Sequence, residues 1–135
     1  MSTSKSASDG LIRQGWLGIA FFMAVGLLLE SLLAWKTPAY LHDPIRRELF
    51  RLAHSHGALL HLLLIGMAFT ADRRQVPRAC RLSMRVGSIV MPLGFLLAGL
   101  WHPEGDPGHA IWLVPAAAIL VVFGAAGAAL APEIR

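Results

Sequence analysis

The sequence predicts an all-α integral membrane protein, a four-helix bundle, from three observations. Hydrophobic residues make up 56% of the 135 residues and charged residues only 15%, against roughly 25% charged in an ordinary soluble domain. Four apolar stretches meet or approach the roughly 20 residues that a helix needs to cross a hydrocarbon core of about 30 Å. These stretches occupy most of the chain, so almost no residues remain for a separate soluble domain.

The apolar stretches give approximate bounds for four helices. The first covers residues 15–35 and carries one charge, Glu30, and the second covers 50–71, preceded by a short segment, PIRRELFR, that could lie at the membrane surface. The third covers 84–102 and the fourth 109–131; each contains a proline, which membrane helices tolerate. We expect residues 15–132 to form one transmembrane domain, between a disordered tail, 1–14, and a short tail, 133–135.

Lysine and arginine counts predict the orientation of the helices. Two lie in the N-terminal tail, five in the middle loop and one at the C-terminus, eight in all, whereas the first loop holds four and the third loop none. Because cytoplasmic loops carry the excess of basic residues, both termini should be cytoplasmic. The basic middle loop lacks the interleaved aromatic residues of a nucleic-acid stacking platform, so nucleic acid is excluded as a partner and anionic lipid is favoured.

Three histidines, His54, His56 and His61, lie within the second predicted helix, RLAHSHGALLHLLLIGMAF. Titratable side chains within a membrane usually face the protein interior or a water-filled cavity. In the predicted orientation His54 and His56 lie near the outer boundary, and His61 lies about 15 Å inside it. Glu30 lies in the outer half of the first helix, so a Glu–His pair between the first two spanning helices is expected.

The spacing of the trio argues against a metal site within one helix. His54 and His61 share a stripe but lie about 10.5 Å apart along the axis, too far for one metal with bonds of about 2.0–2.1 Å. His54 and His56 point to opposite faces. A site would therefore need other elements. Interfacial hydrogen bonding by His54 and His56, and a structural hydrogen bond from Glu30, remain the alternatives.

The third loop, WHPEGDPGHA, adds His102 and His109 beside Glu104 and Asp106. The same residues also fit a plain type II turn, with Asp, Pro and Gly at successive positions. All the histidines fall in the outer half of the protein or beyond it, which predicts one outer cluster. Its expected members are the cofactor ligands His54, His56, His61 and Glu30, and the metal ligands His54, His61, His102 and His109.

The segment LAHSHGALLHLLL resembles a pattern, AHxHG followed by an apolar helix, found in small uncharacterised bacterial membrane proteins. It is also similar, over about twenty residues, to the histidine-bearing helices of haem–copper oxidase subunit I. The resemblance implies a multi-pass protein of the bacterial inner membrane and haem or copper ligation by His54, His56 or His61. The chain has four spans instead of a dozen and lacks the oxidase's other histidine-bearing helices, so oxidase activity is not inferred.

Three functions are consistent with the sequence. The first is binding of haem or of a transition metal such as copper or zinc by the outer His/Glu cluster. The second is a non-catalytic subunit or assembly factor that binds another membrane protein or a second copy of the chain. The third is a small proton-coupled transporter in which Glu30 and His61 titrate. No nucleophile–base pair, phosphate loop or HExxH sequence is present, so the sequence gives little support for an enzyme.

Overall fold

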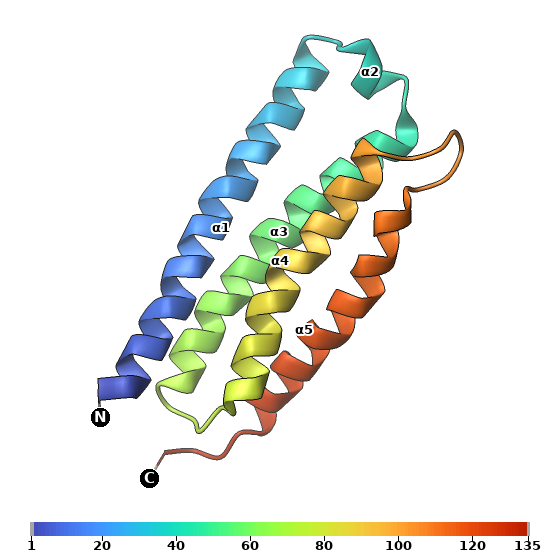
Figure 1. Ribbon diagram of the computed structural model, residues 1–135. Coiled ribbons are helices and arrows are strands. Elements are labelled where there is room, and N and C mark those ends of the chain that lie inside the picture. The colour runs from blue at the N-terminus through green and yellow to red at the C-terminus, as the bar shows by residue number, and fades with distance from the viewer. Residues whose placement is uncertain (1, 135) are drawn as a thin grey trace.

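The computed structural model describes residues 2–134 and contains the four long helices that the sequence predicts. They are α1 (Ser2–Ala34), α3 (Pro44–Ala71), α4 (Arg78–Leu100) and α5 (Leu113–Leu130), joined by a short helix, α2 (Pro38–Leu41), and a 3₁₀ turn, η1 (His109–Trp112). Figure 1 shows the four helices packed as a bundle, with both ends of the chain at the same end of it. Which end faces the cytoplasm stays a prediction.

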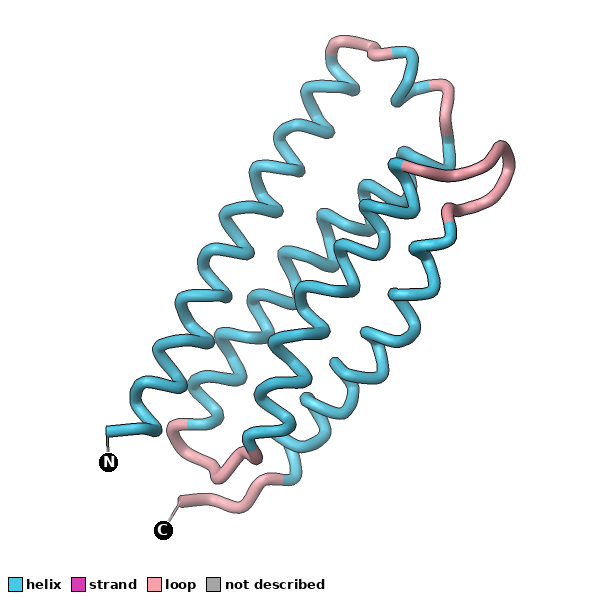
Figure 2. The backbone as a smooth tube through the Cα atoms, viewed as in Figure 1, coloured by secondary structure: helices cyan, strands magenta, loops and turns pink. Residues whose placement is uncertain are grey.

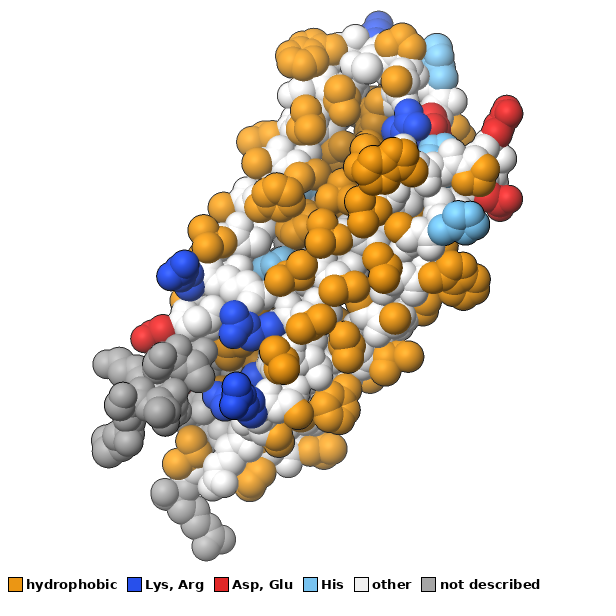
Figure 3. Space-filling view, in the orientation of Figure 1, with side chains coloured by type: hydrophobic (Ala, Val, Ile, Leu, Met, Phe, Trp, Pro, Cys, Tyr) orange, Lys and Arg blue, Asp and Glu red, His pale blue; other side chains and the backbone are white. Residues whose placement is uncertain are grey.

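Each long helix is apolar and long enough to cross a membrane, over Ser8–Ala34, Pro44–Ala71, Arg78–Leu100 and His109–Leu130. On the face drawn in Figure 3, hydrophobic side chains cover the middle of the helices, and charged side chains gather toward the two ends. This distribution matches a hydrocarbon layer bounded by two polar surfaces. The predicted multi-pass membrane architecture is thus supported, and contact with a lipid bilayer follows from it.

The helices pack mainly against their neighbours in the chain: α1 on α3, α3 on α4, and α4 on α5. Figure 2 shows the same order, with loops confined to the two ends. As a result α3 and α4 are the most buried helices, whereas α1 and α5 leave most of their surface exposed. Because α1 packs mainly on α3 alone, cavities can form beside it, between α1 and α3 and between α1 and α4.

Helix α1 begins at Ser2 and not at residue 15, so the segment expected to be a disordered tail is helical from its second residue. Tertiary contacts explain the difference. The Ser8 hydroxyl donates a hydrogen bond to the Asp72 carboxylate at 2.6 Å, and Leu11 is only 1% exposed in a core cluster with Leu64 and Ala68. Burial of Ser8 and Leu11 outweighs the polar composition of the segment.

Helix α3 also begins earlier than predicted, at Pro44, so PIRRELFR continues into the spanning helix and is not a separate surface helix. Asp43 caps it, accepting a hydrogen bond from the Arg46 backbone N–H at 2.9 Å. Pro44 fills the first helical position, where no N–H is needed. The cap and the proline fix the start of the helix at the end of the bundle that carries α2.

Aromatic and imidazole rings seated on glycines join α1 to α3. The three ring–glycine contacts, in order along α1, are His61 on Gly18, Phe22 on Gly57, and His54 on Gly26. Any side chain at these glycines would overlap the ring, because even a Cβ atom has no room. Small residues allow membrane helices to approach closely. His54 and His61, two of the three histidines singled out in the sequence, therefore contribute to helix packing.

We predict that Gly57→Ala destabilises the fold, because the added methyl group would meet the Phe22 ring. Overpacking of this kind costs about 1 to 3 kcal/mol. The matched control is Gly66→Ala in the same helix, where a Cβ meets no atom within 4 Å. Circular dichroism of the purified proteins in detergent should show a lower Tm for Gly57→Ala alone. Equal Tm values for the two variants would contradict the ring–glycine contact.

Candidate functional site

The three histidines of α3 point in different directions, as their spacing predicts. His54 and His61 face α1, whereas His56 faces α4, where its ring lies 5.1 Å from the Phe95 ring between centroids. The His56 Nδ1–H donates to the Leu52 carbonyl at 2.9 Å. His56 thus packs between α3 and α4 and is not among the described residues that line the cavities of His54 and His61.

His61 is the most buried of the three, with 3% of its surface exposed. Its Nδ1 lies 2.7 Å from the Gly57 carbonyl; a carbonyl can only accept, so Nδ1 carries the hydrogen and Nε2 of the neutral ring carries a lone pair. No hydrogen bond to that Nε2 is recorded among the residues that the structure describes. Every fully buried side-chain nitrogen or oxygen among them has a hydrogen-bond partner. Because the His61 Nε2 has none, it is not fully buried, and it faces a cavity that His61 lines.

That cavity is a groove of about 620 Å³ between α1 and α4, which we call the α1/α4 groove. Its walls are mostly apolar, and its lining comprises Gly10, Arg13, Gln14, Leu17, Gly18, Phe21, Phe22, His61, Arg85, Ile89 and Leu93. Figure 3 shows a histidine in the hollow between the two helices, with basic side chains below it. The groove thus contains one imidazole, and basic side chains lie at one of its ends.

Gln14 closes the basic end of the groove by joining α1 to α4. Its amide donates to the Arg85 carbonyl at 3.0 Å, and its amide oxygen accepts from the Arg85 Nε–H at 2.8 Å. This pair holds the Arg85 guanidinium at the groove, and no contact of its terminal nitrogens is recorded among the described residues. Arg13 lies one residue before Gln14 and supplies a second positive charge.

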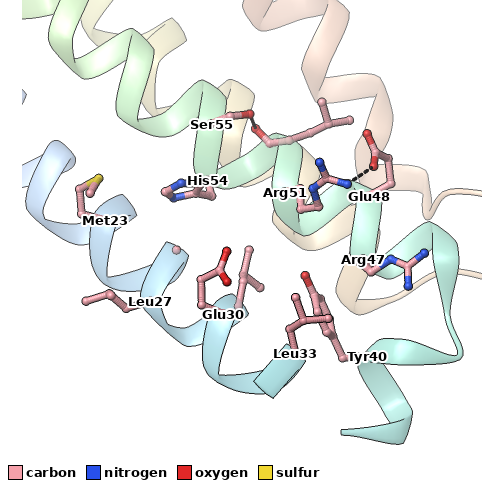
Figure 4. Close-up of a pocket in the computed structure, with 13 residues that line it drawn as sticks. Met23, Leu27, Glu30, Leu33, Tyr40, Arg47, Glu48, Arg51, His54 and Ser55 are labelled. Carbon is pink, nitrogen blue, oxygen red and sulfur yellow. Dashed lines mark hydrogen bonds and ion pairs between the residues drawn. The ribbon is translucent and has the colours of Figure 1, made fainter. Parts of the chain in front are cut away.

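A second cavity, the α1/α3 pocket, lies between α1 and α3 next to α2 and measures about 820 Å³. Figure 4 shows Glu30 from α1 and His54 from α3 in this one pocket. The expected Glu30–His hydrogen bond is not among the contacts of the described residues. Instead the His54 Nδ1–H donates to the Phe22 carbonyl at 2.7 Å, and Glu30 remains exposed.

The third-loop histidines have separate roles. His102 has a side chain only 7% exposed, and its Nε2 lies 2.9 Å from the Asp43 carboxylate. His109 is exposed at the start of η1. Among residues 8–134, no group of three or more His, Cys, Asp or Glu side chains is placed to hold a metal ion. The four expected metal ligands are therefore not brought together: three of them contact different partners, and His109 is exposed.

Residues beyond the predicted cluster complete both cavities. Arg13 and Arg85 line the groove, and Tyr40, Arg47 and Arg51 line the α1/α3 pocket. In the sequence these arginines were explained by membrane topology. Arg13 and Arg85 lie on different helices, far apart in the chain, so no local spacing could have paired them.

Comparisons with protein-family models, with curated proteins and with solved structures found no match to this chain. The resemblance of the LAHSHG segment to bacterial membrane proteins and oxidase helices therefore stays a prediction. The chain is a four-helix protein with long apolar helices, and its function must be inferred from the chemistry of the two cavities.

The Asp43–His102 pair should make stability depend on pH. Burial raises the pKa of Asp43, but the hydrogen bond from the Arg46 N–H and the charges of His102 and Arg46 outweigh it, so the pKa lies below its ordinary value of 3.8. A lowered folded-state pKa contributes stability that is present above pH 3.8 and is lost as the pH falls through the folded-state value.

We therefore expect Asp43→Asn to lower the Tm at neutral pH, and the difference from wild type to shrink only below about pH 4. Thermal melts at a series of pH values measure this difference. Asp106→Asn, in the exposed third loop, is the control and should follow wild type throughout. A Tm difference that stays constant down to pH 2 would show that the contacts of the ionised Asp43 carboxylate do not stabilise the fold.

Proposed function

We propose that the protein binds haem in the α1/α4 groove, with the His61 Nε2 as the protein ligand of the iron. The observation that carries the proposal is a single imidazole that opens into an apolar groove with an arginine pair at one end. Haem has the complementary chemistry: an iron that binds imidazole, a flat apolar macrocycle, and two carboxylates on one edge.

The hydrogen bond at the other ring nitrogen supports a ligand role for His61. A metal-ligating histidine almost always donates its second N–H to a carboxylate, a backbone carbonyl or water, which fixes the tautomer and raises the basicity of the ligating nitrogen. The 2.7 Å contact between the His61 Nδ1 and the Gly57 carbonyl supplies this orientation. The ring lies against Gly18, where any side chain would overlap it.

The position of the arginines supports the orientation of the macrocycle. Arg13 precedes Gly18 by five residues on α1, which places it about 7.5 Å from the imidazole along the helix axis. Arg85 lies at the level of Gln14, to which it is hydrogen-bonded. Both guanidinium groups can therefore bind carboxylates on the rim of a macrocycle whose iron is at His61.

A bare copper or zinc ion has less support than haem. Structural zinc sites take four protein ligands, and catalytic sites take three. The groove offers one histidine and the α1/α3 pocket offers another, and the described part of the chain holds no three-ligand group. Haem supplies four of its own iron ligands, so one histidine is enough to anchor it.

We expect the purified full-length protein to bind one equivalent of added haem and to give a Soret band that His61→Ala abolishes. Optical titration in detergent measures both results. The control is His42→Ala, which removes an exposed histidine outside both cavities. Added imidazole should restore the Soret band of His61→Ala, because it can occupy the place of the missing side chain and supply the missing ligand.

Two results would overturn this proposal. One is a wild-type protein that binds no haem at any concentration that keeps haem soluble. The other is a His61→Ala variant that binds haem as tightly as wild type while keeping its helical circular dichroism.

We expect Arg13→Gln and Arg85→Gln each to weaken haem binding about tenfold or more, because a hydrogen bond to a charged group is worth about 1.5–3 kcal/mol. The position of the Soret band should not change, since the iron ligand stays the same. Arg78→Gln, an exposed arginine at the start of α4, is the matched control and should bind haem as wild type does. A band shift without a change in affinity would contradict carboxylate binding by these arginines.

A further inference from the structure

The α1/α3 pocket has one acid, Glu30, on its α1 wall, and two arginines and one acid, Glu48, on its α3 wall. Glu30 from α1 is exposed, and no ion pair to it is recorded among the described residues. From α3 come Arg47 and Arg51, one helical turn apart. In Figure 4 the Glu30 carboxylate projects into the space between α1 and α3, and the Arg51 guanidinium is drawn in an ion pair with Glu48. That ion pair, at 3.5 Å, is largely exposed, so it is easily exchanged for another anion.

Other polar groups complete the lining beside Glu30. The His54 Nδ1–H is used by the Phe22 carbonyl, which leaves the His54 Nε2 as an acceptor. Tyr40 is 5% exposed, and burial raises the pKa of its phenol above 10.0, against the lowering effect of the charges of Arg51 and Arg47. Its hydroxyl therefore stays protonated. One side of the pocket thus offers acceptors for a cation and the other offers donors for an anion.

The pocket lies at the boundary of the apolar layer. Arg51 is the last charged residue before the uncharged run 52–71 of α3. Glu30 lies one turn before the end of α1 at Ala34. Lipid headgroups occupy this level of a membrane, and arginine side chains at helix ends reach toward it.

The remaining walls are hydrocarbon and open toward the lipid side. They comprise Met23, Leu27, Leu29, Leu33 and Leu52. Leu27 is 70% exposed and Leu33 48% exposed on α1. Acyl chains attached to a headgroup in the pocket can therefore continue along α1 without crossing a polar surface.

From this arrangement we propose that the α1/α3 pocket binds a zwitterionic phospholipid with a primary ammonium, phosphatidylethanolamine. The ammonium donates hydrogen bonds to the Glu30 carboxylate and the His54 Nε2, and the phosphate accepts from Arg51 and Arg47. Phosphatidylcholine has the same charges, but its ammonium has no N–H to donate. Phosphatidylglycerol carries the same phosphate but has no cation to pair with Glu30. The proposal is independent of haem binding, which uses the opposite side of α1.

Native mass spectrometry of the full-length protein in detergent, with equal amounts of the three lipids, tests the site. Wild type should retain phosphatidylethanolamine about tenfold over phosphatidylcholine, since hydrogen bonds to a charged group are worth about 1.5–3 kcal/mol. Glu30→Gln should reduce that ratio several-fold, toward one. Glu104→Gln, which removes an exposed acid from the third loop, should leave the ratio unchanged.

Arg51→Gln tests the phosphate contact separately. It should lower retention of phosphatidylethanolamine and phosphatidylcholine together, because both carry the phosphate, while the ratio between them stays that of wild type. The proposal is overturned if wild type prefers phosphatidylglycerol or shows no preference among the lipids. It is also overturned if Glu30→Gln retains the wild-type ratio. All these lipid measurements are made without added haem, so they do not depend on whether the α1/α4 groove binds haem.

Discussion

The close approach of α1 to α3 is the constraint on which the rest of the structure depends. Three rings seated on glycines bring the two helices together along their length. Because Gly18 and Gly26 have no side chains, His54 can donate to a carbonyl of the other helix, and the His61 imidazole lies against α1. The same contacts leave α1 packed on α3 along one side, so its other surface borders the α1/α4 groove.

The two histidines that make these contacts combine packing with an available ring nitrogen. Each satisfies Nδ1 with a backbone carbonyl, and each lines a different cavity. A hydrophobic ring of similar size could fill the glycine positions, but it would leave no lone pair at either cavity. A buried polar group costs free energy unless it is satisfied, so the carbonyl contacts allow imidazole at these positions without that cost. The groove and the pocket then differ in their charged residues: two arginines line the groove, whereas two acids and two arginines line the pocket.

At the end of the bundle that carries α2, a polar network holds the loops in place. Arg46 donates from its side chain to the Gly99 and Ala39 carbonyls, and Asp43 binds both the Arg46 N–H and His102. These contacts join the start of α3 to the end of α4. His102, which looked like a metal ligand in the sequence, therefore stabilises the loops and is not among the residues that line the α1/α3 pocket.

The sequence by itself determined the helix number, the spans and the direction of each α3 histidine, because hydropathy and the 100° step of a helix are local properties. It did not determine the start of α1, since the burial of Ser8 and Leu11 depends on residues of α3. Nor did it separate His61 from Glu30 or pair Arg13 with Arg85. Those relations depend on which helices become neighbours and how closely they pack. Close packing of α1 on α3 depends on contacts between glycines and rings of the other helix, and these contacts form only in the folded chain.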